Sequence, residues 1–251
     1  MSVCFQKFHA TRFIIFIIMS TLTHAVALTV GSSIGKKALV AVTGAVLAGF
    51  VLGHMIGNLL IFAGPDAINE YGHLLQTMLH GMGVWVARIG LLACTVVHVV
   101  LTVQLTRENR AARPGRYGYD ATIQATRSSR TMIFSGLTLL AFIVYHLMHF
   151  TLRVGNEYAT YKTTLHGEQV HDVYRMVIDG FSWWPASVFY LIAMAMLCSH
   201  LSHGVSSMFQ TLGLSTPRTM GTFRMVGRAY AALIFGGNAF IVLAVWFKWV
   251  H

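Results

Sequence analysis

The stretch FIVYHLMHFT, residues 142–151, places two histidines three residues apart in a run of side chains suited to hydrocarbon. It ends the apolar segment 131–152, in which no lysine, arginine, aspartate or glutamate occurs. At ~1.5 Å per residue, a helix of this length crosses the ~30 Å hydrocarbon core of a bilayer. Ionisable side chains are costly at such a depth and usually belong to a functional site. The stretch therefore predicts a transmembrane helix whose histidines have a function.

The composition of the whole chain is that of a membrane protein. Of its 251 residues, 55% are hydrophobic and 10% are charged, whereas soluble domains carry about 25% charged residues. Apolar segments long enough to cross a bilayer occupy about 34–62, 84–106, 131–152, 186–212 and 228–250. We therefore expect an all-α fold, an integral membrane bundle of five transmembrane helices over residues 34–251.

Lysine and arginine are distributed unequally between the two ends of the expected bundle. If the helices alternate in direction, one end receives five of these cations together with most of the acids. The other end receives eleven, namely Lys36, Lys37, Arg107, Arg110, Arg113, Arg116, Arg127, Arg130, Arg218, Arg224 and Arg228. Because cytoplasmic loops carry the excess of lysine and arginine, we expect this cationic end to be cytoplasmic and the C-terminal His251 to lie outside. The expected location is the cytoplasmic (inner) membrane of a bacterium, and the net charge of +10 concerns topology and anionic membrane lipid rather than nucleic acid.

Residues 1–33 form an extension before the first helix. Lys7 and Arg12 precede FIIFIIMSTLTHAVALTV, residues 13–30, a pattern typical of the charged and apolar regions of a signal peptide. A sixth span is the other reading, but this apolar run is short and contains several polar residues, Ser20, Thr21, Thr23 and His24. We expect an additional interfacial or docked helix.

Four histidines lie deep in four different predicted helices. Measured from the cytoplasmic end at ~1.5 Å per residue, His54 and His146 lie roughly 30 and 24 Å deep, and His98 and His200 roughly 15 and 18 Å. The histidines thus form an outer pair, His54 and His146, and an inner pair, His98 and His200. Two histidines at one depth on facing helices are what axial ligation of a haem iron requires.

Other readings of these histidines remain open at this point. A single buried histidine often just hydrogen-bonds a neighbouring helix. His149 and His203 lie one helical turn beyond His146 and His200, so each is an alternative ligand by depth, or a group that supports the haem or its protons. Nearby glycines would allow either a flat macrocycle to approach the backbone or helices to pack closely; they are Gly49, Gly53, Gly57, Gly136 and Gly204.

The motifs around these histidines resemble those of one family. They are SSIGKKALVAVTG at the start of the first span, GHMIGN with His54, HVVLTVQLTRENRAARP with His98, YHLMHFT with His146, and FYLIAMAMLCSHLSHGVSSMFQTLG with His200. Together they resemble the cytochrome b558-type membrane anchor of succinate dehydrogenase and fumarate reductase, the single-subunit form with five spans and two b haems. The resemblance runs from about residue 32 to the C-terminus.

The resemblance implies a function, cofactors and partners. His54 and His146 would bind the iron of a distal haem b, and His98 and His200 that of a proximal haem b. In related sequences, the residues that follow each ligand histidine match those after His146 and His200, so the resemblance favours His146 over His149 and His200 over His203. The implied partners are a flavoprotein subunit that oxidises succinate and an iron–sulfur subunit on the cytoplasmic face. The resemblance is also compatible with a higher oligomer of the complex. Electrons would pass between the iron–sulfur subunit and quinone, which in this family is usually menaquinone.

The quinone and haem-propionate sites have weaker candidates. Ser33 and Lys37 lie where an inner quinone needs donors, although a helix N-cap and topological charge explain them as well. Glu70 and His73 follow the first span, where they would handle protons at an outer quinone site or belong to a solvated loop. Arg130 is placed to pair with a haem propionate.

Three rival functions are compatible with parts of the sequence. The first is a di-haem, quinone-linked subunit of another respiratory complex, such as formate dehydrogenase or hydrogenase. The second is a haem-free transporter that uses histidines as a proton relay. The third is a serine hydrolase, because GSSIG, residues 31–35, fits the G-x-S-x-G nucleophile elbow; that elbow requires a preceding strand and a nearby acid, and here it precedes a membrane span.

Overall fold

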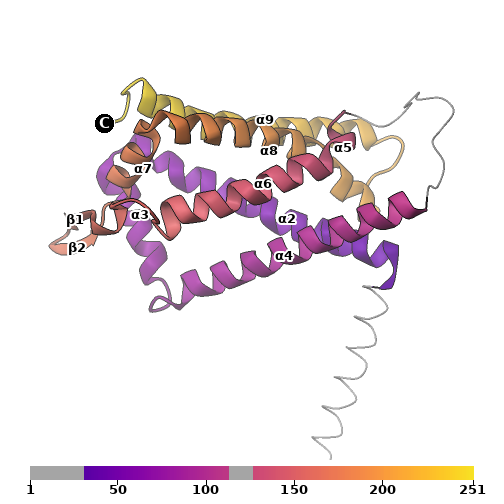
Figure 1. Cartoon of the computed structure of the whole chain (residues 1–251), viewed down its shortest axis with the longest axis horizontal. Helices are drawn as coiled ribbons and strands as arrows, with labels where there is room; N and C mark the ends of the chain where they lie inside the picture. The colour runs from indigo at the N-terminus through magenta and orange to yellow at the C-terminus, as the bar shows by residue number, and fades with distance from the viewer. Residues whose placement is uncertain (1–30, 113–126) are drawn as a thin grey trace, which may run out of the picture.

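The computed structural model describes residues 31–112 and 127–251 (Figure 1). Within them, five helices are long and apolar enough to cross a membrane. They are α2 (Ser33–Asn58), continued by the 3-10 turn η1 (Leu59–Ala63); α4 (Met82–Ala111); α6 (Met132–His146), continued by the π-helical turn η2 (Leu147–Thr151); α8 (Trp184–Thr211); and α9 (Met220–Trp246). The five helices run along one common direction in the bundle (Figure 1). The prediction of an all-α bundle with five membrane-spanning helices is confirmed.

The helix bounds differ from the predicted spans mainly at the cationic end. α4 continues to Ala111 instead of ending near 106, and α9 begins at Met220 instead of 228. These extra turns carry charged side chains, including Arg107, Arg110 and Arg224. Hydropathy ends a span where charge begins, whereas a helix continues until its backbone is capped or broken. The predicted interfacial helix of the N-terminal extension lies outside the described residues.

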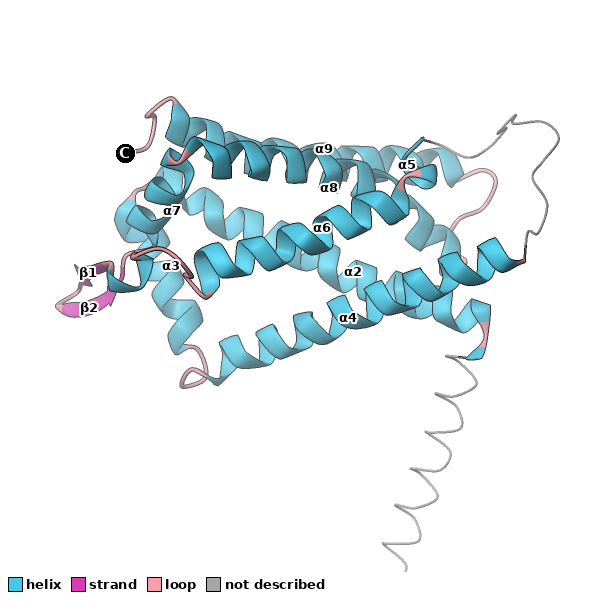
Figure 2. Cartoon of the chain, in the orientation of Figure 1, coloured by secondary structure: helices cyan, strands magenta, loops and turns pink. Residues whose placement is uncertain are grey.

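A small cap covers the end of the bundle opposite the cationic loops. It consists of α3 (Pro65–Thr77), η3 (Tyr158–Thr160), the antiparallel hairpin of β1 (Lys162–Leu165) and β2 (Glu168–His171), and α7 (Val173–Ser182) (Figure 2). The sequence predicts no helix between the membrane spans, whereas the structure has α3 and α7 there. α3 begins with Pro65 and carries Asp66 in its first turn, both favourable at a helix N-terminus. The amide N–H of Arg175 donates to the Asp172 side chain over 3.0 Å, which caps α7.

A buried asparagine joins the parts of the cap. Asn69 of α3 is 2% exposed. Its amide nitrogen donates to Asp172 Oδ1 over 3.2 Å, and its oxygen accepts from the Tyr174 backbone N–H over 2.9 Å. Both ends of the buried amide are therefore paired, which holds α3 against the start of α7.

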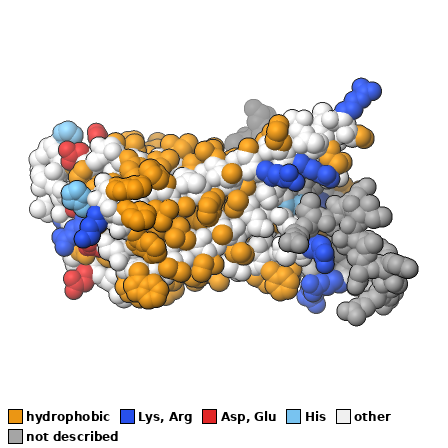
Figure 3. Space-filling view, turned by 90° about the horizontal axis from the view of Figure 1, so that it is seen from above, with side chains coloured by type: hydrophobic (Ala, Val, Ile, Leu, Met, Phe, Trp, Pro, Cys, Tyr) orange, Lys and Arg blue, Asp and Glu red, His pale blue; other side chains and the backbone are white. Residues whose placement is uncertain are grey.

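The surface has the distribution expected of a membrane protein. Hydrophobic side chains cover the middle of the bundle, Lys and Arg predominate at one end, and the acids seen in this view lie at the other, beside a few further cations (Figure 3). All five tryptophans lie at the capped end, at the start of α4 and α8 and the end of α9. Tryptophan is enriched where hydrocarbon meets lipid headgroups. The aromatic side chains therefore mark the membrane interface at the capped end.

α2 and α4 are joined near the cationic end by an ion pair. Lys36 of α2 is buried, and its ammonium group contacts the carboxylate of Glu108 on α4. Lys36 is thus a structural residue as well as part of the cationic end. Lys37, which follows it, points outward and is exposed.

The remaining stretch at the cationic end is α5 (Arg127–Arg130), one turn that precedes α6. Residues 113–126, with the predicted loop cations Arg113 and Arg116, lie outside the described residues. The described lysines and arginines of this predicted set lie in α2, α4, α5 and α9 and in the loop before α9.

Candidate functional site

The outer pair of histidines meets between α2 and α6. The ring centres of His54 and His146 are 5.7 Å apart. Phe50 stacks on His54 at 5.4 Å and Phe142 on His146 at 5.8 Å, each one helical turn earlier on the same helix. Aromatic side chains thus hold both imidazoles in an apolar environment within the span.

The inner pair meets between α4 and α8. The ring centres of His98 and His200 are 6.5 Å apart. Each ring lies against a glycine of another helix. A Cβ at Gly44 of α2 would lie 3.1 Å from His98 Cε1, and one at Gly136 of α6 would lie 3.5 Å from His200 Cε1. All four transmembrane helices that carry a deep histidine, α2, α4, α6 and α8, therefore contribute to these two sites.

Neighbouring groups hold the Nδ1 atom of three of the four histidines. His98 Nδ1 lies 3.2 Å from the Val40 carbonyl oxygen and 3.2 Å from Thr43 Oγ1. His200 Nδ1 lies 3.1 Å from Ser135 Oγ, and His146 Nδ1 lies 3.1 Å from Tyr190 Oη. A metal-binding histidine characteristically donates its other ring N–H to such an acceptor, which fixes the ring orientation and tautomer. His54 has no such partner among the described residues.

The geometry of both pairs fits axial ligation of a haem iron. An imidazole nitrogen lies about 2 Å from a metal that it binds, so two axial rings, whose centres lie about 1 Å further back, are held roughly 6 Å apart. The observed separations of 5.7 and 6.5 Å bracket this value. Within residues 31–112 and 127–251, no hydrogen bond engages Nε2 of the four histidines, and no three metal-binding side chains converge on one point. Axial ligation of a haem needs only two.

The structure distinguishes His146 and His200 from their neighbours. His149 Nδ1 lies 3.2 Å from Tyr190 Oη, and its ring packs on Phe150 at 4.1 Å and faces Gly180 of α7. It therefore faces the cap rather than α2. Among the described residues, His203 makes no ring contact with His98. The π-helical turn η2, a feature frequent at functional sites, begins directly after His146 and contains His149.

The glycines near the histidines divide between the two expected roles. Gly49, Gly53 and Gly204 have open space where a Cβ would point. The ring of Tyr71 from α3 fills the space beside Gly57, so this glycine serves close packing, whereas a Cβ at Gly136 would meet His200 at an ordinary 3.5 Å. Open backbone beside His54 is compatible with a flat group lying against α2.

The tight contact at Gly44 leads to a testable prediction. Gly44→Ala would place a methyl group 3.1 Å from His98 Cε1, closer than ordinary van der Waals contact. We expect this variant to displace His98 and to change the absorption spectrum of a haem bound by the inner pair. Gly136→Ala is the matched control, because its methyl group would meet His200 at an ordinary 3.5 Å. Identical spectra for the two variants would contradict the assigned packing.

The inner quinone candidates lie at the first turn of α2. Ser33 and Lys37 are both exposed. The N-cap of α2 is Ser32, whose Oγ accepts the Gly35 N–H over 3.0 Å, so the N-cap reading of Ser33 is wrong. No described group connects Ser33 to an acid and a histidine as a hydrolase triad requires. Among the described residues, neither Ser33 nor Lys37 makes a hydrogen bond or ion pair with any of the four deep histidines.

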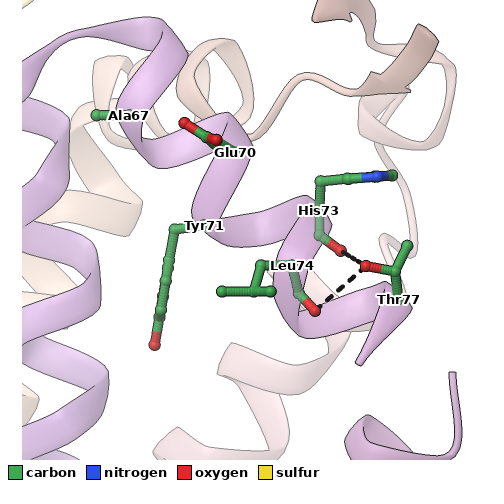
Figure 4. A pocket seen from close by; sticks show the side chains of 6 residues that line it. All are labelled: Ala67, Glu70, Tyr71, His73, Leu74 and Thr77. Carbon is green, nitrogen blue, oxygen red and sulfur yellow. Dashed lines mark hydrogen bonds between the residues drawn. The ribbon is translucent and has the colours of Figure 1, made fainter. Parts of the chain in front are cut away.

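The outer quinone candidates Glu70 and His73 share one depression on α3. It is also lined by Tyr71 and Thr77, with Ala67 and Leu74 (Figure 4). The Tyr71 ring and the His73 imidazole extend from the helix in different directions (Figure 4). His73 Nε2 lies 3.9 Å from Glu168 Oε2 of the hairpin. The two candidates thus lie on one open surface of the cap instead of in an enclosed site, and Thr77 Oγ1 donates back to the His73 carbonyl oxygen over 2.9 Å.

Arg130, the candidate for a haem propionate, ends α5 and is exposed. It makes no ion pair within the described residues. Sequence reasoning missed Tyr190, Ser135 and Thr43, which hold the histidines through contacts between helices. Each of the three lies more than 40 residues along the chain from the histidine that it contacts, so no local pattern of spacing could have found them.

No protein-family model, curated protein or solved structure matches the chain. The function of the chain is therefore inferred from its residues and their geometry, together with the resemblance of its motifs to the cytochrome b558-type anchor.

Proposed function

We propose that this chain is the membrane anchor and cytochrome b subunit of a succinate:quinone oxidoreductase. It would carry electrons between an iron–sulfur subunit and quinone, with menaquinone as the expected form. The observation that carries the proposal is the presence of two histidine pairs at two depths, with ring centres 5.7 and 6.5 Å apart. The motif resemblance supplies the choice of succinate dehydrogenase over other respiratory complexes.

In this proposal, each pair binds one haem b. His54 and His146 would hold the haem at the capped end, and His98 and His200 would hold the one nearer the cationic end. When bound, haem supplies reversible one-electron oxidation and reduction at iron. The two imidazoles of each pair would exclude oxygen as a ligand of the haem, which suits electron transfer.

The chain's own residues orient these ligands. With Nε2 of His146 reserved for iron, its Nδ1 would carry the proton and donate to Tyr190 Oη. The Tyr190 O–H is then available to donate to His149 Nδ1. Ser135 and the Val40 carbonyl oxygen hold His200 and His98 in the same way. These acceptors raise the basicity of the ligands and fix their rings before haem is bound.

The two ends of the bundle suit different partners. The cationic end offers exposed arginines and lysines to an iron–sulfur subunit, which in turn binds the flavoprotein subunit that carries the dicarboxylate site. At the capped end, Glu70 and His73 lie on the surface next to the tryptophan interface, where a quinone headgroup and protons from the aqueous phase are both accessible. This chain contributes haem and quinone binding to the enzyme.

A haem-free proton relay is the second candidate. It is favoured by the chain of contacts from His146 through Tyr190 to His149, at 3.1 and 3.2 Å. Hydrogen-bonded side chains of this kind also conduct protons in pumps and transporters. The four-histidine arrangement favours haem, because a relay gives no reason for a second pair between α4 and α8.

A reduced-minus-oxidised spectrum of the purified chain, with haem quantified, tests the proposal. We expect a sharp α band of b type and two haems per chain. A protein without haem would overturn the electron-transfer function and favour the relay. One haem per chain would keep the function and contradict the assignment of four ligands.

Tyr190 provides a sharper test of the outer pair. Tyr190→Phe removes the acceptor of the His146 N–H and leaves the imidazole less basic, so we expect the midpoint potential of one haem to rise. The expected rise is on the order of tens of millivolts, since a net hydrogen bond contributes about 1 kcal/mol and about 59 mV of a one-electron couple equals about 1.4 kcal/mol. Redox titration followed at the α band measures it.

Tyr145→Phe is the matched control for that titration. Tyr145 contacts the same cluster, with its ring centre 6.0 Å from that of Tyr190 and 5.5 Å from that of His149, but its hydroxyl makes no hydrogen bond to either histidine among the described residues. Its removal should leave both potentials unchanged. Equal shifts in the two variants would show that Tyr190 acts by packing alone.

A further inference from the structure

Arg153 has an unusual environment. It follows the π-helical turn at the end of the third span and has a backbone φ of +55°. A non-glycine residue in this left-handed region is strained, and such strain is often found at ligand-binding sites. Its Nε is also the one buried side-chain nitrogen or oxygen that lacks a hydrogen-bond partner among residues 31–112 and 127–251. A buried donor of this kind costs free energy unless a ligand satisfies it.

The charge of a second arginine acts on Arg153. Burial lowers the pKa of the Arg153 guanidinium, and the positive charge of Arg88 on α4 lowers it further. Neither arginine forms an ion pair within the described part of the chain. Arg175, at the same end of the bundle, is paired with a carboxylate instead, because its Nε lies 3.6 Å from Asp179 Oδ2. Two guanidinium groups that repel each other without a carboxylate form a site for an anion.

The surroundings indicate which anion fits. Arg88 stacks over the ring of Trp85 at 5.1 Å, and Trp85 is 59% exposed. Leu152 and Val154, on either side of Arg153, are 67% and 57% exposed. The two charges therefore lie at the membrane interface, next to apolar side chains that face lipid. A ligand with an anionic headgroup and acyl chains satisfies both parts, and arginine pairs well with phosphate oxygens.

We propose that Arg88 and Arg153 bind the headgroup phosphate of an anionic phospholipid at the capped end of the bundle, between α4 and the end of the third span. The acyl chains would lie against the exposed side chains of Trp85, Leu152 and Val154. This site does not involve the haem ligands, so a failure of lipid binding and a failure of the proposed function can be distinguished.

Lipid binding to the purified full chain tests the proposal. Native mass spectrometry would count phosphatidylglycerol bound to the detergent-solubilised protein as that lipid is titrated, with phosphatidylcholine titrated in parallel. We expect Arg88→Gln and Arg153→Gln each to weaken phosphatidylglycerol binding about tenfold or more, because each loses a charge-assisted interaction with phosphate. Arg175→Gln, the matched control, should bind as the wild type does. Arg88 is exposed, so Arg88→Gln should fold normally. If Arg153→Gln fails to fold, Arg88→Gln alone still tests the proposal.

Each other result overturns the proposal. Unchanged phosphatidylglycerol binding in Arg88→Gln would show that the arginines do not hold this lipid. An equal loss in Arg175→Gln would show only a general effect of surface charge. If Arg153→Gln instead changed the haem content or spectrum while lipid binding stayed as in the wild type, the anion at this site would be a carboxylate of the cofactor. Equal affinity of the wild type for phosphatidylcholine would exclude selection of an anionic headgroup.

Discussion

His200→Ala is expected to reduce the haem content from two to about one per chain and to leave the remaining haem with its normal spectrum. His200 and His98 face each other at 6.5 Å, and Ser135 holds the Nδ1 of His200. Alanine leaves one imidazole on that side, which cannot complete a bis-histidine site. The outer pair lies on α2 and α6 at another depth and should keep its haem. His98→Ala should give the same result, and His54→Ala and His146→Ala should remove the other haem.

Haem extraction with quantification per chain and the reduced-minus-oxidised spectrum measure this effect together. His203→Ala and His149→Ala are the controls, since each removes an imidazole one turn from a proposed ligand without touching the facing histidine. Both should retain two haems. Loss of a haem in His203→Ala with retention in His200→Ala would transfer the ligand role to His203. Four variants that all kept two haems would refute the histidine assignment as a whole.

The sequence predicted the features that depend on composition and on distance along one helix. Long apolar runs identified the five membrane helices, and rise per residue placed His54 with His146 and His98 with His200. Both kinds of inference use only local regularity. The amphipathic helices α3 and α7 were missed, because short segments of mixed polarity resemble loops until they pack against the bundle and are capped, as α7 is by Asp172.

The parts that could not be predicted depend on how helices rotate against one another. Lys36 and Lys37 are equivalent by hydropathy, yet Lys36 faces α4 and pairs with Glu108 while Lys37 is exposed. Tyr190 meets His146 only because α8 packs beside α6. By sequence, Gly57 could face either a haem or a neighbouring helix. In the structure, the ring of Tyr71 fills the space beside it, so it serves packing. Each of these outcomes follows from a tertiary contact between residues distant in the chain.

The second prediction with a large effect is Gly227→Val, which concerns the contact between α8 and α9. α8 and α9 form the most extensive contact between any two elements of the described structure. A Cβ at Gly227 would lie 2.8 Å from the Ser202 carbonyl oxygen and 3.3 Å from the Ser206 backbone nitrogen, both on α8. Backbone atoms cannot turn aside as a side chain can, so α9 must move away from α8. Overpacking of a core lowers the free energy of unfolding by about 1–3 kcal/mol. We expect the loss in Gly227→Val to reach or exceed the upper end of this range.

The same variant should also affect the inner pair, because His200 lies on α8 two residues before Ser202. We expect a lower thermal unfolding midpoint and loss of about one haem, measured on the same detergent-solubilised sample. Gly236→Val is the matched control: it lies on the same helix, and nothing lies within 4 Å of its added Cβ. It should keep both haems and unfold close to the wild-type temperature. If both variants were equally damaged, β-branching in α9 would be the cause rather than the contact with α8; if neither were, the helices would not cross at Gly227.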